Sequence, residues 1–206
     1  MSTSSIKMLI AASALAAASV SAFANTSLYS TSNLMANYSG SNGTVNASFA
    51  SLSATNASLS FQLGGLLSLD GANSYSDVFT LRLNGSQIFR GTFNLGGGGA
   101  NQVLFNPYGA SVLVTTFGTT FGDSHNSTET TWAGGIADIS FSGISLNTGI
   151  NTLTFGYGSN LQGLGDEGWK VNAVNVSAVP EPETYAMLFA GLGLMGAVVR
   201  RRKNKR

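Results

Sequence analysis

Four acidic residues of this sequence stand where a metal ion could be bound, and these are Asp70, Asp77, Asp166 and Glu167. Calcium takes about six to eight oxygen ligands, many of them carboxylates, so a calcium site is one prediction for this group. The spacing is not that of an EF-hand loop. Asp70 and Asp166 also stand next to glycines, and that neighbour is typical of aspartates in turns. The residues alone leave both readings open, calcium binding and a role in turns.

The sequence offers little for catalysis. His125 is the only histidine, in the segment "GDSHNSTET", with Asp123 two residues before it. A Ser-His-Asp triad depends on placement in space, which proximity in the sequence does not establish. A zinc site usually needs several His or Cys ligands, and the chain has no cysteine. Two carboxylates could serve glycoside hydrolysis, but nothing marks a pair. We therefore expect no enzyme, and a glycan-acting hydrolase is a remote alternative.

Aromatic residues suggest a second kind of chemistry, the binding of extracellular polysaccharide. Sugar rings pack on exposed aromatic faces while amides and carboxylates form hydrogen bonds to the hydroxyls. The candidates are Trp132 in a polar loop, Tyr108 beside a proline, and Tyr157 before a glycine. For each of them, packing in the core is the competing interpretation. Trp169 begins a predicted strand, so we expect it in the core.

One segment, residues 77–93, "DVFTLRLNGSQIFRGTF", predicts a β-hairpin. Apolar residues alternate with other residues from Phe79 to Leu83, and two-residue alternation resumes between Phe89 and Phe93. Alternation of this period is typical of half-buried strands. The Asn-Gly pair at 84–85 tolerates the positive φ angles that a tight hairpin turn needs.

Similar patterns predict six further strands. They are Ala57 to Leu63, Gln102 to Phe105, Ala110 to Phe117, Ile136 to Phe141, Ile150 to Tyr157 and Trp169 to Ala178. Glycine-rich or polar segments separate them, and the exported domain shows no sustained helical stripe. This pattern predicts an all-β fold with a single two-sheet β-sandwich, jelly-roll-like in connectivity. Residues 25–56 are expected to be either loosely ordered or polar edge strands.

The domain between the two chain ends, residues 25–178, is mildly acidic. It holds three basic and seven acidic residues, hence a net charge of −4, although the whole chain sums to +1. Nucleic-acid binding depends on lysine and arginine contacts to phosphates, so we expect none. Without cysteine, the stability of this exported domain must come from a packed core and not from disulfides.

The N-terminal residues 1–24 are predicted to be a secretory signal peptide. A single positive charge at Lys7 precedes an apolar stretch from Met8 to Val20, and Ala22-Phe23-Ala24 follows. An apolar run of about thirteen residues fits a signal peptide and is shorter than the roughly twenty residues of a membrane span. We expect signal peptidase to cleave between Ala24 and Asn25.

The C-terminal residues 179–206 combine a proline-glutamate motif, an uncharged run and a basic tail. The uncharged run, residues 184–199, would be about 24 Å long as a helix, against about 30 Å of membrane core. The basic tail, residues 200–206, would stay cytoplasmic. Prolines at 180 and 182 keep the preceding chain extended and accessible to a protease. These features predict a processing signal with a short transmembrane helix, and a permanent single-pass anchor is the alternative.

The segment "VPEPETYAMLFAGLGLMGAVVRRRK" resembles the PEP-CTERM sorting signal of Gram-negative bacteria. In that family the tail is recognised by an exosortase, a membrane-embedded cysteine transpeptidase-like enzyme, and members are associated with exopolysaccharide and biofilm or floc formation. The resemblance implies that Pro180, Glu181 and Pro182 are the recognition motif and that residues 184–199 cross the membrane transiently. It also implies a basic stop made of Arg200, Arg201, Arg202 and Lys203.

These observations together predict an exported protein of the cell surface or extracellular matrix with a structural or adhesive role. Its precursor would be inserted in the inner membrane transiently, and its processing partners would be signal peptidase and an exosortase. A lectin-like module for extracellular polysaccharide is the alternative function. No cofactor is expected other than the calcium considered above.

Overall fold

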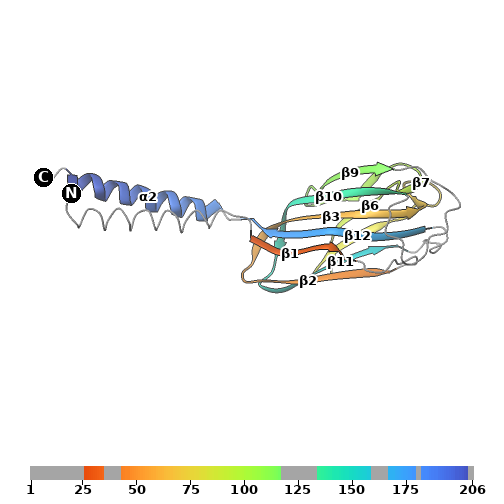
Figure 1. Ribbon diagram of the computed structural model, residues 1–206, viewed down its shortest axis with the longest axis horizontal. Helices are drawn as coiled ribbons and strands as arrows, with labels where there is room; N and C mark the ends of the chain where they lie inside the picture. The colour runs from red at the N-terminus through yellow and green to blue at the C-terminus, as the bar shows by residue number, and fades with distance from the viewer. Residues whose placement is uncertain (1–25, 35–42, 117–133, 159–166, 180–181, 204–206) are drawn as a thin grey trace. The chain divides into compact units, whose positions relative to one another are not determined.

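The computed structural model describes residues 26–34, 43–116, 134–158, 167–179 and 182–203 (Figure 1). These residues belong to two compact units. One unit is Ser27–Ala178, and the other contains both chain ends, residues 1–26 and 179–206.

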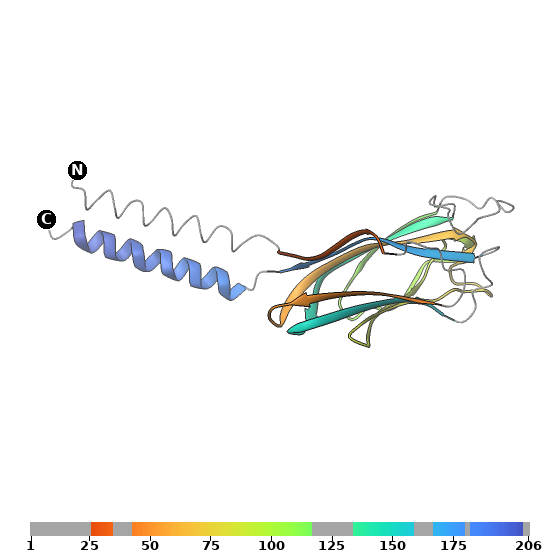
Figure 2. The same cartoon turned by 60° about the horizontal axis from the view of Figure 1, so that its bottom comes forward.

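The unit Ser27–Ala178 is built on two five-stranded sheets that face each other (Figure 2). The first sheet has the order β1 (Thr26–Asn33), β12 (Glu167–Ala178), β3 (Thr55–Leu67), β10 (Gly135–Leu146) and β9 (Ser111–Thr116). The second has the order β2 (Thr44–Ser51), β11 (Gly149–Tyr157), β5 (Phe79–Leu83), β6 (Ser86–Thr92) and β8 (Gln102–Phe105). A small third sheet pairs β4 (Leu69–Asp70) with β7 (Gly96–Gly98) in parallel.

The strand order is that of a jelly roll. The first and last strands, β1 and β12, are neighbours in one sheet, and β2 and β11 are neighbours in the other. Strand β3 pairs antiparallel with both β10 and β12. Early strands therefore pair with late ones in nested fashion, as in double Greek-key sandwiches. The prediction of an all-β sandwich is confirmed.

The predicted hairpin is confirmed at its turn. Strands β5 and β6 pair antiparallel, with Leu83 opposite Ser86. The two residues between them both have positive φ, 51° at Asn84 and 83° at Gly85, which are the values of a type I′ turn. The side chain of Asn84 also reaches β11, because its amide nitrogen donates to Asn151 at 2.8 Å.

The other predicted strands are present, although some are longer than predicted. Strand β10 extends beyond its predicted end to Leu146, because a bulge between Phe141 and Ile144 lets pairing with β3 resume after an irregular step. Strand β3 extends to Leu67, where it pairs with Glu167 of β12. For residues 25–56, the edge-strand alternative is the one observed among the described residues. Strand β1 lies at one edge of the first sheet and β2 at one edge of the second.

The core lies between the two sheets and is rich in aromatic pairs that join them. Phe61 of β3 meets Phe155 of β11 edge-on at 5.1 Å between ring centroids. Phe141 of β10 meets Phe89 of β6 in the same way at 6.0 Å. Such edge-to-face contacts add about 0.5–1.5 kcal/mol each beyond the burial of their area. The core thus supplies the link between the sheets without any disulfide, since the chain has no cysteine.

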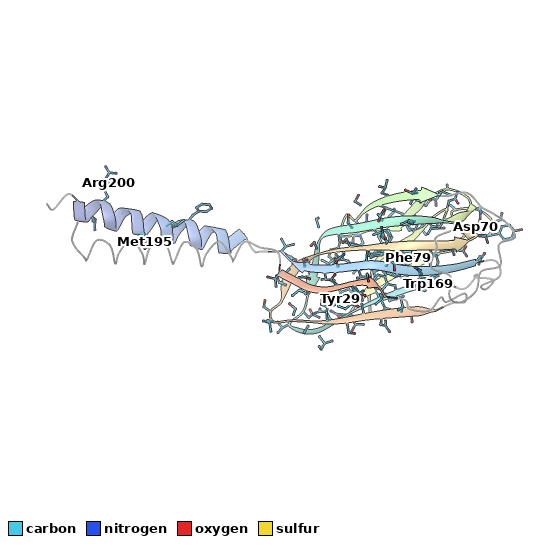
Figure 3. All side chains as sticks on the ribbon, viewed as in Figure 1. Tyr29, Asp70, Phe79, Trp169, Met195 and Arg200 are labelled. Carbon is cyan, nitrogen blue, oxygen red and sulfur yellow. The ribbon has the colours of Figure 1, made fainter. Side chains whose placement is uncertain are left out.

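The second unit contains one described helix, α2 (Pro182–Lys203), on which Met195 and Arg200 lie (Figure 3). This confirms a helix in the uncharged C-terminal run. The expected membrane crossing by residues 184–199 is not supported, because among the residues described no helix combines the length and the apolar character that a membrane span requires. The uncharged run has only sixteen residues, against the roughly twenty of an ordinary span.

The type I′ turn gives a prediction for stability. Replacing Gly85 by alanine forces a side chain into a left-handed conformation, although no atom lies within 4 Å of the new methyl group. We expect Gly85→Ala to lower the free energy of unfolding by about 1–2 kcal/mol in urea titrations. Gly143→Ala is the matched control, since its new methyl group also meets open space but its φ is not positive. Equal losses in both variants would contradict the assignment of strain to the turn.

Candidate cation-binding site

Three of the four acidic residues predicted to bind an ion lie together. Asp70, Asp77 and Glu167 each have a carboxylate oxygen within 4.8 Å of the others. Their side chains are 7%, 2% and 2% exposed. Figure 3 places Asp70 near one end of the sandwich. Burial of carboxylates is costly unless they are paired or bind a metal. The fourth predicted residue, Asp166, lies outside the described residues.

The three residues come from different sheets. Asp70 ends β4 in the small parallel sheet, Asp77 stands two residues before β5 of the second sheet, and Glu167 begins β12 of the first sheet. Each position is fixed by the pairing of its strand, for example Glu167 by its register with Leu67 of β3. The cluster therefore joins all three sheets at one place.

The loop from Asp70 to Asp77 is closed by its own hydrogen bonds. The backbone NH of Asp70 donates to Oδ2 of Asp77 at 2.8 Å, and the backbone NH of Asp77 donates to the carbonyl of Asp70 at 3.2 Å. Within the loop, the amide nitrogen of Asn73 donates to Oδ1 of Asp70 at 2.5 Å. The side-chain oxygen of Asn73 accepts from the NH of Tyr75 at 2.7 Å. These bonds fix both aspartate carboxylates in position.

Strand β7 passes very close to the carboxylate of Asp70. A β-carbon placed on Gly97 would lie 2.7 Å from both Cγ and Oδ2 of Asp70 and 2.3 Å from the carbonyl oxygen of Ser68. Only glycine can occupy that position without a shift of the backbone. On the other side, the hydroxyl of Thr92 donates to the carbonyl of Asp70 at 3.0 Å. The position of Asp70 is therefore constrained by close packing against β7 and by the hydrogen bond from Thr92.

Two buried aromatic residues with polar atoms are close in sequence or in charge effect to the cluster: Trp169 is two residues from Glu167, and Asp77 acts on Tyr157. Tyr157 and Trp169 pack edge-on at 5.3 Å between ring centroids, and they are 6% and 0% exposed. The Tyr157 hydroxyl and the Trp169 indole nitrogen are both buried without a hydrogen-bond partner among the described residues. Burial raises the pKa of Tyr157 well above its usual value, and the nearby charge of Asp77 raises it further.

The acids lie close in sequence to aromatic residues of the core. Asp77 is two residues from Phe79, and Glu167 is two residues from Trp169. Residues two apart in a strand share a face, so Glu167 and Trp169 lie on the same face of β12, whereas Asp77 precedes β5. Tyr157 contacts both Phe79, at 5.6 Å between ring centroids, and Trp169. Its ring is therefore held between the two neighbours of the acidic residues.

Lys170 is the one buried basic residue in the described part of the chain, at 7% exposure. It follows Glu167 by three positions in β12, where side chains alternate between the two faces. Its side chain therefore leaves β12 on the face opposite to that of Glu167.

The aromatic residues predicted to bind sugar are placed differently from expectation. Tyr157 is in the core, so its prediction as an exposed sugar platform is wrong; its alternation with Phe155 and Leu153 along β11 buries it. Tyr108 is half-buried and packs against the core. Trp169 is in the core, as predicted. Trp132 and His125 lie outside the described residues.

A polar hollow lies on the first sheet, away from the acidic cluster. Its volume is about 220 Å³, and it is lined by residues of β3, β10 and β12 beside the positive φ of Ala173, which is 48°. The side-chain nitrogen of Gln62 donates to Asp138 across the strands at 2.9 Å. Nearby, the hydroxyl of Ser30 donates to Asn175 at 2.7 Å. The lining thus offers amide, hydroxyl and carboxylate groups.

Sequence reasoning missed Asn73, Gly97 and the role of Tyr157 near the acids. A signal for Asn73 was available, since "DGANSYSD" has an aspartate at each end and an asparagine between them. No local signal identifies Gly97, because one glycine in "LGGGGA" is distinguished from the others only by what it meets in space.

The C-terminal end carries a known sorting signal. Residues 178–203 match the family model described as the PEP-CTERM protein-sorting motif. The chain therefore carries a PEP-CTERM sorting motif, which implies an exported protein that is processed at the membrane. Among curated proteins, no sequence matches this chain.

Several solved structures are similar to the chain at low identity. Latent PorU from Porphyromonas gingivalis is 14% identical with a TM-score of 0.40, over 75% of this chain and 12% of that one. CBM35 of Abf62 from Cellvibrio japonicus is 10% identical with a TM-score of 0.35, over 76% and 88%. A family 35 carbohydrate binding module from an environmental isolate is 13% identical with a TM-score of 0.33, over 76% and 90%. This chain thus spans only a small part of PorU, and scores this low support no statement about function.

The tight approach of β7 to Asp70 gives a second prediction. Gly97→Ala places a methyl group against the Asp70 carboxylate and the Ser68 carbonyl, so the β4–β7 pairing must shift. We expect the free energy of unfolding to fall by about 1–3 kcal/mol in urea titrations. Gly158→Ala is the control, because its new methyl group would make only ordinary contacts, at 3.6 Å or more. A Gly97→Ala protein as stable as the control would show that β7 does not constrain Asp70.

Proposed function

We propose that this protein is a structural or adhesive component of the cell surface or extracellular matrix, sorted there by an exosortase. The observation that carries the proposal is the position of the sorting motif. The motif begins at residue 178, which is also the last residue of β12. The sandwich therefore ends where the sorting signal starts, and processing at the motif would release an intact domain.

The composition of the domain supports the same proposal. Its strands expose mainly Ser, Thr and Asn, as in the cross-strand bond between Ser48 and Thr152 at 2.9 Å. A surface of this kind keeps the domain soluble with few charges. We include in the proposal that the domain has no catalytic activity of its own and works through its surface.

The processing partners follow from the two ends of the chain. Signal peptidase would cut between Ala24 and Asn25, and an exosortase would recognise Pro180, Glu181 and Pro182. The basic residues from Arg200 to Lys203 would complete the signal that is read at that step. Association with exopolysaccharide and biofilm belongs to the same proposal.

The motif can be tested in the producing cells. We expect Glu181→Gln to leave a membrane-associated precursor of higher mass, because the recognition motif loses its charge, and surface protein should fall several-fold by immunoblotting of fractions. Glu183→Gln is the matched control, since it removes the same charge two residues further on. Normal processing of Glu181→Gln, or equal accumulation in both variants, would contradict the assignment of the motif.

Binding of extracellular polysaccharide is the second candidate function, and the polar hollow on the first sheet favours it. Gln62 and Asp138 present hydrogen-bonding groups in that hollow, and such groups fix the orientation of a sugar. Trp132 would supply a stacking surface in this alternative.

Co-sedimentation with exopolysaccharide from the producing cells separates the two functions. For a structural component we expect no saturable binding, and equal behaviour of wild type, Asp138→Ala and Trp132→Ala. Saturable binding that falls at least tenfold in a folded Asp138→Ala or Trp132→Ala protein would instead establish the lectin function. Circular dichroism of each variant is the control for folding.

A further inference from the structure

We propose that Asp70, Asp77 and Glu167 bind one calcium ion, which fastens the three sheets together at one end of the sandwich. This inference is independent of the sorting motif and of the surface role. It rests on four observations about the described residues: the distances between the carboxylates, their burial, the prior positioning of the loop, and the polar aromatic atoms beside them.

The distances suit a single ion. Oxygens bound on opposite sides of calcium, each at about 2.4 Å from it, are about 4.8 Å apart. Asp70, Asp77 and Glu167 each offer an oxygen within 4.8 Å of the other two. Separations no greater than this are compatible with one ion shared by all three carboxylates.

The burial of the cluster favours a bound cation. Three carboxylates of at most 7% exposure repel one another more strongly than they would in water, because the local dielectric constant is low. A divalent cation compensates two of the three charges at once. The loop hydrogen bonds from Asn73 and from the backbone of Asp70 hold the carboxylates together before the ion arrives, which lowers the ordering cost of binding.

Tyr157 is the independent indication of a ligand. Its hydroxyl is buried without a hydrogen-bond partner among the residues described, although a buried polar group is normally satisfied. The ring lies between Phe79 and Trp169, which are two residues from Asp77 and Glu167 along the chain, and the charge of Asp77 acts on Tyr157. A water molecule bound to the ion at this point would satisfy both the Tyr157 hydroxyl and the Trp169 indole NH, the second buried atom without a partner.

Calcium fits the donor set better than the alternatives. All three side-chain ligands are hard oxygens, which exclude soft metals. Magnesium keeps several waters in a strict octahedron, and a cluster this buried has little room for them. Calcium tolerates irregular geometry and binds to extracellular modules with dissociation constants of about 0.1–1 mM.

Thermal unfolding of the purified full-length chain tests the proposal. We expect calcium at about a hundred times its dissociation constant to raise the Tm by about 5–10 °C over the protein in chelator. Magnesium at the same concentration should raise it much less. Glu167→Gln and Asp77→Asn should lose most of the calcium effect, while Asp138→Asn, an exposed acid that bonds Gln62 elsewhere, should keep it.

Terbium luminescence gives a second readout that needs no unfolding and no variant. Terbium takes the place of calcium, and energy from Trp169 and Tyr157 should sensitise its emission when the protein is excited near 280 nm. Calcium should then quench the emission by displacement, and Glu167→Gln should lower it at least fivefold. Circular dichroism confirms that each variant is folded.

Specific outcomes would overturn the inference. Equal Tm values in calcium and chelator, with no sensitised emission, would mean that protein groups or bound protons balance the carboxylates. A calcium effect that Glu167→Gln and Asp138→Asn retain equally would place the ion elsewhere on the acidic surface. An equal effect of magnesium would exclude a calcium-selective site.

Discussion

The contact between the two sheets is the interaction on which the rest of this structure depends. The chain has no cysteine, so no disulfide holds one sheet against the other. Edge-on aromatic pairs do this instead, with one ring from each sheet in Phe61–Phe155, Phe89–Phe141 and Tyr157–Trp169. Because each pair has one preferred geometry, the pairs fix the relative position of the sheets as well as their separation.

That constraint explains where the acidic cluster lies. In the last of these pairs, Trp169 lies two residues after Glu167 on the same face of β12, and Tyr157 is opposite Phe79, two residues after Asp77. A cluster assembled from three sheets is stable only if those sheets keep their relative positions. The aromatic pairs supply that rigidity, so the carboxylates can be held close together despite their repulsion. Packing and charge are thus coupled at this end of the molecule.

Much of the fold could be predicted from the sequence because it depends on local patterns. Two-residue alternation marks the strands, and Asn84-Gly85 identifies its turn through backbone conformation alone. The bulge between Phe141 and Ile144 could not be predicted, since it depends on pairing with a strand about eighty residues away. For the same reason Tyr157 was misplaced. Its neighbours suggest a loop end, and only its partners across the sandwich show that it is buried.

The candidate site shows the same limit. Asp70 and Asp77 could be proposed as partners because the segment between them is a short loop with turn residues. Glu167 is ninety positions further along, and only the nested jelly-roll order brings its strand to the same end. The importance of Gly97 follows from its close approach to Asp70 in the structure. The sequence alone does not distinguish it from the other glycines of the same run. Long-range topology therefore decides which of the predicted ligands meet.

Strand β12 connects the acidic cluster to the sorting motif. It begins at Glu167 in the acidic cluster and ends at Ala178, where the sorting motif starts. It lies inside the first sheet between β1 and β3 and not at an edge, so its backbone is paired on both sides. A cut within the motif would therefore leave the last strand fully hydrogen-bonded. The whole length of β12 separates the sorting motif from the acidic cluster. Cleavage at the motif can therefore occur without disturbing the carboxylates.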